Sequence, residues 1–507
     1  MKIFKCLLIT LFISLINKAN SQTIDDILRV SMQNYEGTSR FAAMGGAFGA
    51  LGGDVSALSV NPGGIGVFRK AMVSFTGSLN HNYNNSALTG INSIDSRTRP
   101  GISNMGYIYS DFEEDKRLNW VFGISYTKRA NFNRRTFARS AYSENSIIDY
   151  ISNKANSDIS FFNRSDLESV YAFEDYDPLD WDVVLGHGTY LIYWDDTDEK
   201  YYGDLYQNDK LKQQINVLHK GSSNELLISG GFNLDDKFYV GASLGLNFMA
   251  YGKNVSYYED AHEDNISEFK RLAYNTNLKI EGAGMNLKIG TIYRPLPFIR
   301  FGFAFHSPDY FISSYSNSEE NNNTMFNNYN ASMETEFVTS SGSEIYSDEP
   351  GEEFPLFFNR LRTPLKTVGS LAFMFGRFGL ISADCEFINY SGIRISGSEP
   401  KSAYNSDMSE HFKNTFNFRL GTEIWIKNIA LRGGYNYYPS PDKLYNLSRK
   451  SYSAGIGYRI RDLQFDIAYV QSNSKDFYTP YTGANTITEN LKNRRISLTV
   501  GWRFNPD

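Results

Sequence analysis

Long hydrophobic runs are the first thing that this 507-residue chain lacks. Its one apolar run, Cys6–Ile16, is shorter than the roughly 20 residues that a membrane-spanning helix needs. No comparable run follows it, so the sequence excludes a helical membrane protein.

The first 21 residues have the features of a secretory signal peptide. Lys2 and Lys5 precede the apolar run, and Ala19-Asn-Ser21 places small residues just before a cleavage site. We therefore expect residues 1–21 to be removed and the exported chain to begin at Gln22.

Cysteine and positive charge are also scarce. Of the two cysteines, Cys6 lies in the leader, so Cys385 alone would remain and no intramolecular disulfide could form. The 50 Lys and Arg against 56 Asp and Glu give a net charge of −6, which argues against a nucleic-acid partner. No Gly-X-Ser-X-Gly elbow or recognisable nucleophile–base grouping occurs, so the sequence indicates neither an enzyme nor a cofactor.

Alternation of apolar and polar residues is what the chain has in abundance. From Ile496 to Phe504, for example, every second residue is apolar, which is typical of a strand with two different faces. Fourteen such segments are predicted, near residues 72–82, 101–110, 119–130, 224–233, 236–252, 280–293, 298–306, 364–375, 378–390, 412–426, 428–438, 450–461, 463–472 and 494–504.

Short connections alternate with long ones along this series, which is the pattern of a transmembrane barrel with short periplasmic turns and long outer loops. An aromatic content of 15% suits the girdles of such a barrel. We therefore predict an all-β fold, a 14-stranded antiparallel barrel over residues 71–507, with large outer loops near 131–223 and 307–363. Apolar spacing in Ser143–Ala155 and Leu205–His219 predicts a helix in each of two loop segments.

Charged residues of the second half fall in the register opposite to the apolar set. Because a cation facing lipid costs about 2–4 kcal/mol at mid-membrane, these side chains are expected to face the lumen. Their mixed signs favour a salt-bridge network that ties the wall to a plug, with a polar translocation path as the alternative. The candidates are Asp384, Glu386, Arg419, Glu423, Arg432 and Arg459.

Residues 22–70 lack strand alternation. A short helix is expected over Ile24–Gln33, and Ser39–Asp54 is rich in Gly and Ala, which allow backbone to pack against backbone. The run Asn61-Pro62-Gly63-Gly64 then predicts a tight turn. A compact segment placed just before a barrel suits an internal hatch.

Several of these motifs resemble the FadL/TodX family of outer-membrane channels. Ala43-Met-Gly-Gly-Ala-Phe48, followed by an acidic residue and Asn61-Pro62, is similar to the family's Gly-rich hatch, with Gly63 and Ile65 where Ala and Leu are usual. Arg362-Thr-Pro364, Arg419 to Glu423 and Tyr438-Pro-Ser-Pro441 resemble later family segments.

The resemblance implies a barrel closed by an N-terminal hatch that admits long-chain fatty acids or aromatic hydrocarbons by passive diffusion. A general porin for polar solutes is one alternative. A haem-binding receptor is the other, because similar proteins are sometimes labelled hemin receptors; none of the six His shows paired spacing.

The expected location is the outer membrane of a Gram-negative bacterium, with lipid around the wall and a hydrophobic small molecule as ligand. Trp502 and Phe504 form an aromatic ending that resembles the signal read by barrel-assembly machinery, although Asn505, Pro506 and Asp507 follow it. A monomer is expected.

Overall fold

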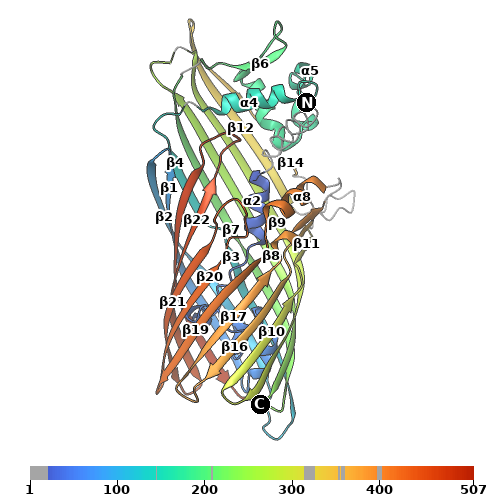
Figure 1. Ribbon diagram of the computed structural model, residues 1–507, viewed down its shortest axis with the longest axis vertical. Coiled ribbons are helices and arrows are strands. Elements are labelled where there is room, and N and C mark those ends of the chain that lie inside the picture. Colours follow the sequence, from blue (N-terminus) through green and yellow to red (C-terminus); the bar gives the residue numbers. More distant parts are fainter. Residues whose placement is uncertain are drawn as a thin grey trace, which may run out of the picture.

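The computed structural model describes residues 21–506, apart from 144, 207–208, 266, 313–325, 352–353, 356–359 and 397–401. The predicted signal peptide, Ser21 excepted, lies outside the described residues. Figure 1 shows a tall barrel with an irregular cap of helices and loops at one end.

The wall is a closed antiparallel barrel of fourteen strands, each paired with the next, and the last pairs with the first through Ala71 and Phe504. The predicted fold class is therefore confirmed. The strands are β1 (Ala71–Leu88), β2 (Ile91–Ser110), β3 (Leu118–Asn131), β7 (Leu211–Leu234), β8 (Phe238–Ala261), β9 (Phe269–Leu296), β10 (Ile299–His306), β16 (Lys366–Met374), β17 (Gly379–Ile388), β19 (Thr415–Ile426), β20 (Ile429–Tyr438), β21 (Arg449–Ile460), β22 (Leu463–Tyr478) and β23 (Ile487–Phe504).

The outward face of these strands carries a band of exposed apolar residues. On β8 the band includes Phe238, Leu244 and Phe248, all exposed, while Ser243 and Asn247 on the opposite register are buried. Transmembrane strands need about 9–11 residues to cross the hydrocarbon. Because β7, β8 and β9 have 24, 24 and 28 residues, their remaining lengths stand above the membrane.

The two ends of the barrel differ in their connections. At the turn end, which holds the C-terminus in Figure 1, short links such as Lys427–Asn428 and Arg461–Asp462 join neighbouring strands. At the opposite loop end most connections are longer, although only Thr89 and Gly90 join β1 to β2. In barrels of this kind the short turns are periplasmic, which makes the loop end the outer one.

An outer domain of small helices packs on the tall part of the wall. It comprises α4 (Ile147–Ser157), α5 (Arg164–Leu167), α6 (Ala172–Asp175), η3 (Pro178–Asp180), α7 (Trp181–Gly188), β5 (Ile192–Asp195) and β6 (Lys200–Gly203). Its core includes Ile148, Ile151, Trp181 and Leu185, each fully buried. The helix predicted at Ser143–Ala155 thus corresponds to α4. No helix among the described residues is long and apolar enough to cross a membrane.

The helix predicted at Leu205–His219 is wrong, because β7 already begins at Leu211. Leu211, Ile215 and the residues between them alternate buried and exposed, as a strand requires. A spacing of four residues satisfies both the helical and the two-residue period, which explains the error.

The predicted long loops also contain strands that extend the wall. β4 (Arg134–Arg139) pairs with β7, and β12 (Phe326–Thr339) pairs with β9. The remaining elements at the loop end are β11 (Tyr310–Ile312), β13 (Gly342–Asp348), β14 (Phe354–Pro355), β15 (Arg360–Arg362), η4 (Tyr390–Gly392), β18 (Arg394–Ser396) and α8 (Ser402–His411).

Residues 21–68, named here the inner segment, lie within the barrel (Figure 1). They form α2 (Ser21–Ser31), α3 (Ser39–Ala43), η1 (Val55–Ser59) and η2 (Pro62–Val67). Side chains cap the short helices: Thr38 accepts from the Phe41 N–H and Asp54 from the Ser56 N–H. Met44, Phe48 and other apolar side chains are fully buried against the wall.

Substitution of Gly302 by Ala tests how closely this segment is seated. A Cβ at Gly302 would collide with the carbonyl oxygen of Gly49, whereas one at Gly369, on the paired strand, would meet no atom within 4 Å. Overpacking costs about 1–3 kcal/mol. We expect Gly302→Ala to lower the temperature at which the folded barrel loses its fast migration in detergent gels, and Gly369→Ala to leave it unchanged. Equal melting of the two variants would contradict this packing.

Candidate functional site: the lumen and its inner segment

A chain of buried ion pairs joins the inner segment to the wall. Arg40 of α3 donates two hydrogen bonds to Glu423 of β19, both of 2.9 Å. Glu423 also accepts from Arg432 of β20 at 2.6 Å, and Arg432 donates to Asp466 of β22 at 2.6 Å. Except for Arg40, at 12%, these side chains are at most 2% exposed.

The other predicted lumen residues lie close by but do not all make the same contacts. Asp384 accepts from the Gly49 N–H at 3.1 Å, so it too contacts the inner segment. Arg419 and Glu386 pair with each other at 2.6 Å within the wall. Arg459 is half-buried with its guanidinium 4.9 Å from the Trp425 ring centre, and it forms no ion pair with any described residue.

The run Asn61-Pro62-Gly63-Gly64 forms the start of η2. The Asn61 side chain accepts from the Gly63 N–H at 2.9 Å and donates to the carbonyl of Gly49 at 2.6 Å and to that of Thr291, on β9, at 3.0 Å. One amide group therefore closes the turn, holds two parts of the inner segment together and attaches both to the wall.

A second charged cluster went unpredicted because its members lie between residues 129 and 309, before the strands in which charges were assigned to the lumen. Arg129 pairs with Asp309 at 2.5 Å, and Lys288 pairs with Glu225 at 2.6 Å. Gln33 of the inner segment donates to Asp309 at 2.8 Å. Glu225 and Lys288 do stand in the polar register of otherwise apolar strands, which is the signal that could have identified them.

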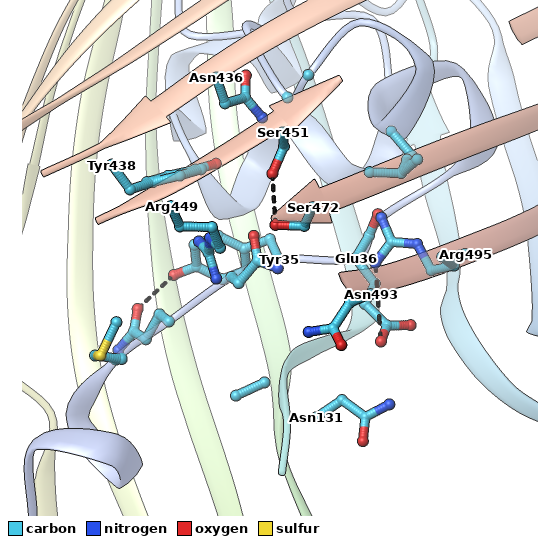
Figure 2. Close-up of a pocket in the computed structure, with 18 of the residues that line it drawn as sticks. Tyr35, Glu36, Asn131, Asn436, Tyr438, Arg449, Ser451, Ser472, Asn493 and Arg495 are labelled. Atoms are coloured by element: carbon cyan, nitrogen blue, oxygen red, sulfur yellow. Dashed lines mark hydrogen bonds and ion pairs between the residues drawn. The ribbon is translucent and has the colours of Figure 1, made fainter. Parts of the chain in front are cut away.

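A cavity of about 240 Å³ lies between α2 and the rest of the inner segment. Figure 2 shows Tyr35 and Glu36 of that segment facing Arg449 and Arg495 of the wall. The Arg449 guanidinium stacks 4.2 Å from the Tyr438 ring centre, and Arg495 donates to the Glu36 carbonyl at 3.1 Å. Basic side chains outnumber acidic ones around this cavity.

α2 crosses the lumen on the outer side of that cavity. Asp26 accepts from Lys253 at 2.8 Å and Arg29 donates to Asp476 at 3.0 Å, which attaches the helix to opposite parts of the wall. Beyond it lies a second cavity of about 180 Å³. Its lining is partly aromatic and includes Leu28, Phe132, Tyr445 and Phe477, with Asp25, Arg134 and Asp476 at the edge.

The wall is incompletely paired beside the first cavity. β1 and β2 pair as far as Leu88 and Ile91, but β2 pairs with β3 only up to Asn104 and Thr127. Among the described strands, none pairs with the β3-side edge of β2 from Ile91 to Ser103. Asn80 and Asn82 of β1 and Asn131 of β3 line the cavity, so this seam lies next to it.

A closed antiparallel barrel with residues 21–68 of its own chain inside the lumen has the fold of an outer-membrane β-barrel. No protein-family model matches the sequence, and no curated protein sequence matches it. The likeness is therefore one of structure.

The fold is similar to that of a Pseudomonas aeruginosa FadL homologue, at 12% identity and a TM-score of 0.51, over 94% of this chain and 99% of that one. A ΔS2 mutant of the TodX monoaromatic hydrocarbon channel matches at 10% identity and 0.51, over 92% and 99%. The P. putida toluene transporter TodX matches at 10% and 0.49, over 94% and 100%. The expected FadL/TodX resemblance is confirmed at the level of the fold by the first two.

Removal of the Arg40 guanidinium tests the buried contact. Loss of one partner from a buried ion pair costs about 3–5 kcal/mol, whereas exposed pairs contribute about 0–1 kcal/mol. We expect Arg40→Gln to lower the urea midpoint of the refolded barrel clearly. Arg69→Gln is the matched control, because Arg69 and Asp236 pair with side chains that are 52% and 36% exposed. Equal midpoints for the two variants would show that Arg40 does not hold the segment.

Proposed function

We propose that this chain is an outer-membrane channel of the FadL/TodX family for passive uptake of hydrophobic small molecules, with residues 22–70 as its hatch. The observation that carries the proposal is the combination of an occupied lumen and an unpaired wall seam beside the cavity. A solute that reaches the cavity meets the inner segment below it and the seam at its side.

A general porin is the weaker alternative. Between the cavity and the turn end, the residues from Phe41 to Ile65 pack against the wall, and their apolar side chains are nearly all buried. Water and sugars need a continuous polar channel, which this packing leaves no room for. A hydrophobic solute, by contrast, can leave sideways into lipid, where its transfer is favourable.

The charge around the cavity favours a ligand with an acidic end. Lys366, Arg419, Arg449 and Arg495 line it against Glu36 and Glu386. A long-chain fatty acid offers a carboxylate for these cations and an alkyl chain for the aromatic outer cavity. One solved channel of similar fold, TodX, is a monoaromatic hydrocarbon channel, so a plain hydrocarbon is the competing ligand.

Haem binding is less well supported than hydrocarbon or fatty-acid uptake. The two His that lie deepest in the barrel are engaged by protein groups: His306 Nε2 hydrogen-bonds the Val60 carbonyl at 2.8 Å, and His219 Nδ1 hydrogen-bonds the Tyr251 hydroxyl at 2.9 Å. An axial ligand needs a ring nitrogen that points at open space of haem size.

Export by the leader, insertion by barrel-assembly machinery and function as a monomer complete the proposal. Trp502 stacks on Phe504 at the end of β23, with ring centres 4.6 Å apart, and this aromatic ending supports the proposed assembly signal.

Uptake into liposomes tests the transported class. Vesicles that contain the refolded barrel should take up a labelled long-chain fatty acid faster than protein-free vesicles and should exclude a small sugar, because the lumen is filled. Toluene uptake is measured in parallel, to distinguish a channel for fatty acids from a channel for plain hydrocarbons. Passage of the sugar alone would replace this proposal with a porin.

Deletion of residues 40–66 tests the hatch. The barrel should still fold, because its strands pair without the segment, but its single-channel conductance in planar bilayers should rise severalfold. A variant carrying Arg69→Gln, outside the deletion, serves as the control. Unchanged conductance after the deletion would contradict a plugging role.

A crosslink across the seam tests lateral exit. A Cβ at Gly101 of β2 would lie 2.7 Å from Nζ of Lys128 of β3, so cysteines at these positions can be bridged by a short reagent. In a Cys385→Ser background, bridging Gly101→Cys and Lys128→Cys should abolish fatty-acid uptake, and cleaving the bridge should restore it. Uptake that survives the bridge would favour exit past the inner segment.

A further inference from the structure

Four cations gather on the outward face of three neighbouring strands at the loop end. They are Lys450 of β21, Lys475 of β22 and Lys492 and Arg494 of β23, all exposed. This set is named here the outer cation patch. β21, β22 and β1 are seen on the left of Figure 1, and β23 lies between β22 and β1 and pairs with both.

Strand register shows that the patch faces outward. Lys492 pairs with Asn473 and Tyr83, and Arg494 pairs with Gln471 and His81. Directly paired residues share a face of the sheet. Two residues further down β23, Ile496 pairs with Tyr469 and Leu79, which belong to the exposed apolar band.

The patch therefore lies just above the apolar band, at the height of the lipid headgroups. Tyrosines accompany it, as in the aromatic girdle of outer-membrane barrels. Tyr437 pairs with Lys450, and the ammonium of Lys492 lies 6.0 Å from the Tyr83 ring centre.

These cations have no acidic partner on their own face. None of the four forms an ion pair with a described residue. The acids of the same strands point into the lumen, where Arg134 contacts Asp476 and Glu489 and Arg432 contacts Asp466. Elsewhere on the wall the outward Lys279 is paired with Glu281 at 3.3 Å.

We propose that the outer cation patch binds the phosphates of the glycolipid in the outer leaflet, the lipid A type, at a defined place on the wall. The patch offers unpaired ammonium and guanidinium groups at headgroup height, and phosphate accepts several hydrogen bonds from such groups. Tyrosine rings beside them pack against the sugar and the upper acyl chains. The assignment depends on the outer-membrane location proposed above and not on the transported ligand.

Each juxtamembrane cation strengthens binding to an anionic lipid surface by about fivefold. The test compares the wild-type barrel with a triple variant, Lys450→Gln, Lys492→Gln and Arg494→Gln. The matched control is Lys237→Gln, Arg377→Gln and Lys427→Gln, which removes the same charges from exposed positions at the turn end.

Bisphosphorylated lipid A is titrated into each protein in detergent micelles, and the bound lipid is counted by native mass spectrometry. The wild type and the control should bind lipid A equally, and the triple variant at least tenfold more weakly. Dephosphorylated lipid A should bind all three proteins as weakly as lipid A binds the triple variant.

Equal lipid A binding by the wild type and the triple variant would overturn the proposal, as would an equal loss in the control. Phosphatidylglycerol bound as tightly as lipid A would overturn the assignment to the glycolipid. Heat-modified migration of the triple variant, if it matches the wild type, shows that lost binding is not lost folding. Fatty-acid uptake is scored separately, so failure of the channel proposal is distinguishable from failure of this one.

Discussion

A chain segment inside the lumen of a barrel has to pair its charges and backbone polar groups with protein groups, because bulk water is excluded. The ion pair between Arg40 and Glu423 is the most completely paired contact of this kind. Glu423 accepts hydrogen bonds from Arg40 of the inner segment and from Arg432 of the wall, and Arg432 also donates to Asp466. A buried charge that loses its partner is costly. The position of the inner segment, and with it the shape of the space above, depends on this network.

The need to pair buried polar groups also explains the many hydrogen bonds between side chains and backbone at this interface. Side chains of the inner segment bind backbone of the wall, and side chains of the wall bind backbone of the inner segment. Asn61 donates to Thr291, Ser453 donates to Ala43, and Arg300 donates to Leu51. Short helical turns leave many carbonyls unpaired, and the lumen-facing polar residues supply the missing donors. Above this zone α2 adds a second crossing of the lumen, so the cavity is bounded by two parts of one segment and by a seam in the wall.

Much of this could be predicted from the sequence. Two-residue alternation identified all fourteen wall strands, and the polar register placed Glu423 and Arg432 on the inner face. The prediction from alternation failed at Leu211 and Ile215, whose spacing fits both the helical and the strand period. It also failed where strands continue beyond the membrane. There the outward face is polar too, so a wall strand resembles a loop. The cluster of Arg129, Glu225 and Asp309 joins residues far apart in the chain, and no local pattern reports which of them pair.

The sequence by itself determined the class of the molecule, because the choice of lipid-facing and lumen-facing residues is made position by position along each strand. Only the tertiary structure decided which charges meet. The partner of Arg40 lies 383 residues away, and its choice depends on how the inner segment turns at Asn61 and on the register of strands across a closed barrel. The seam between β2 and β3 and the cation patch on β21–β23 likewise exist only once neighbouring strands are in place.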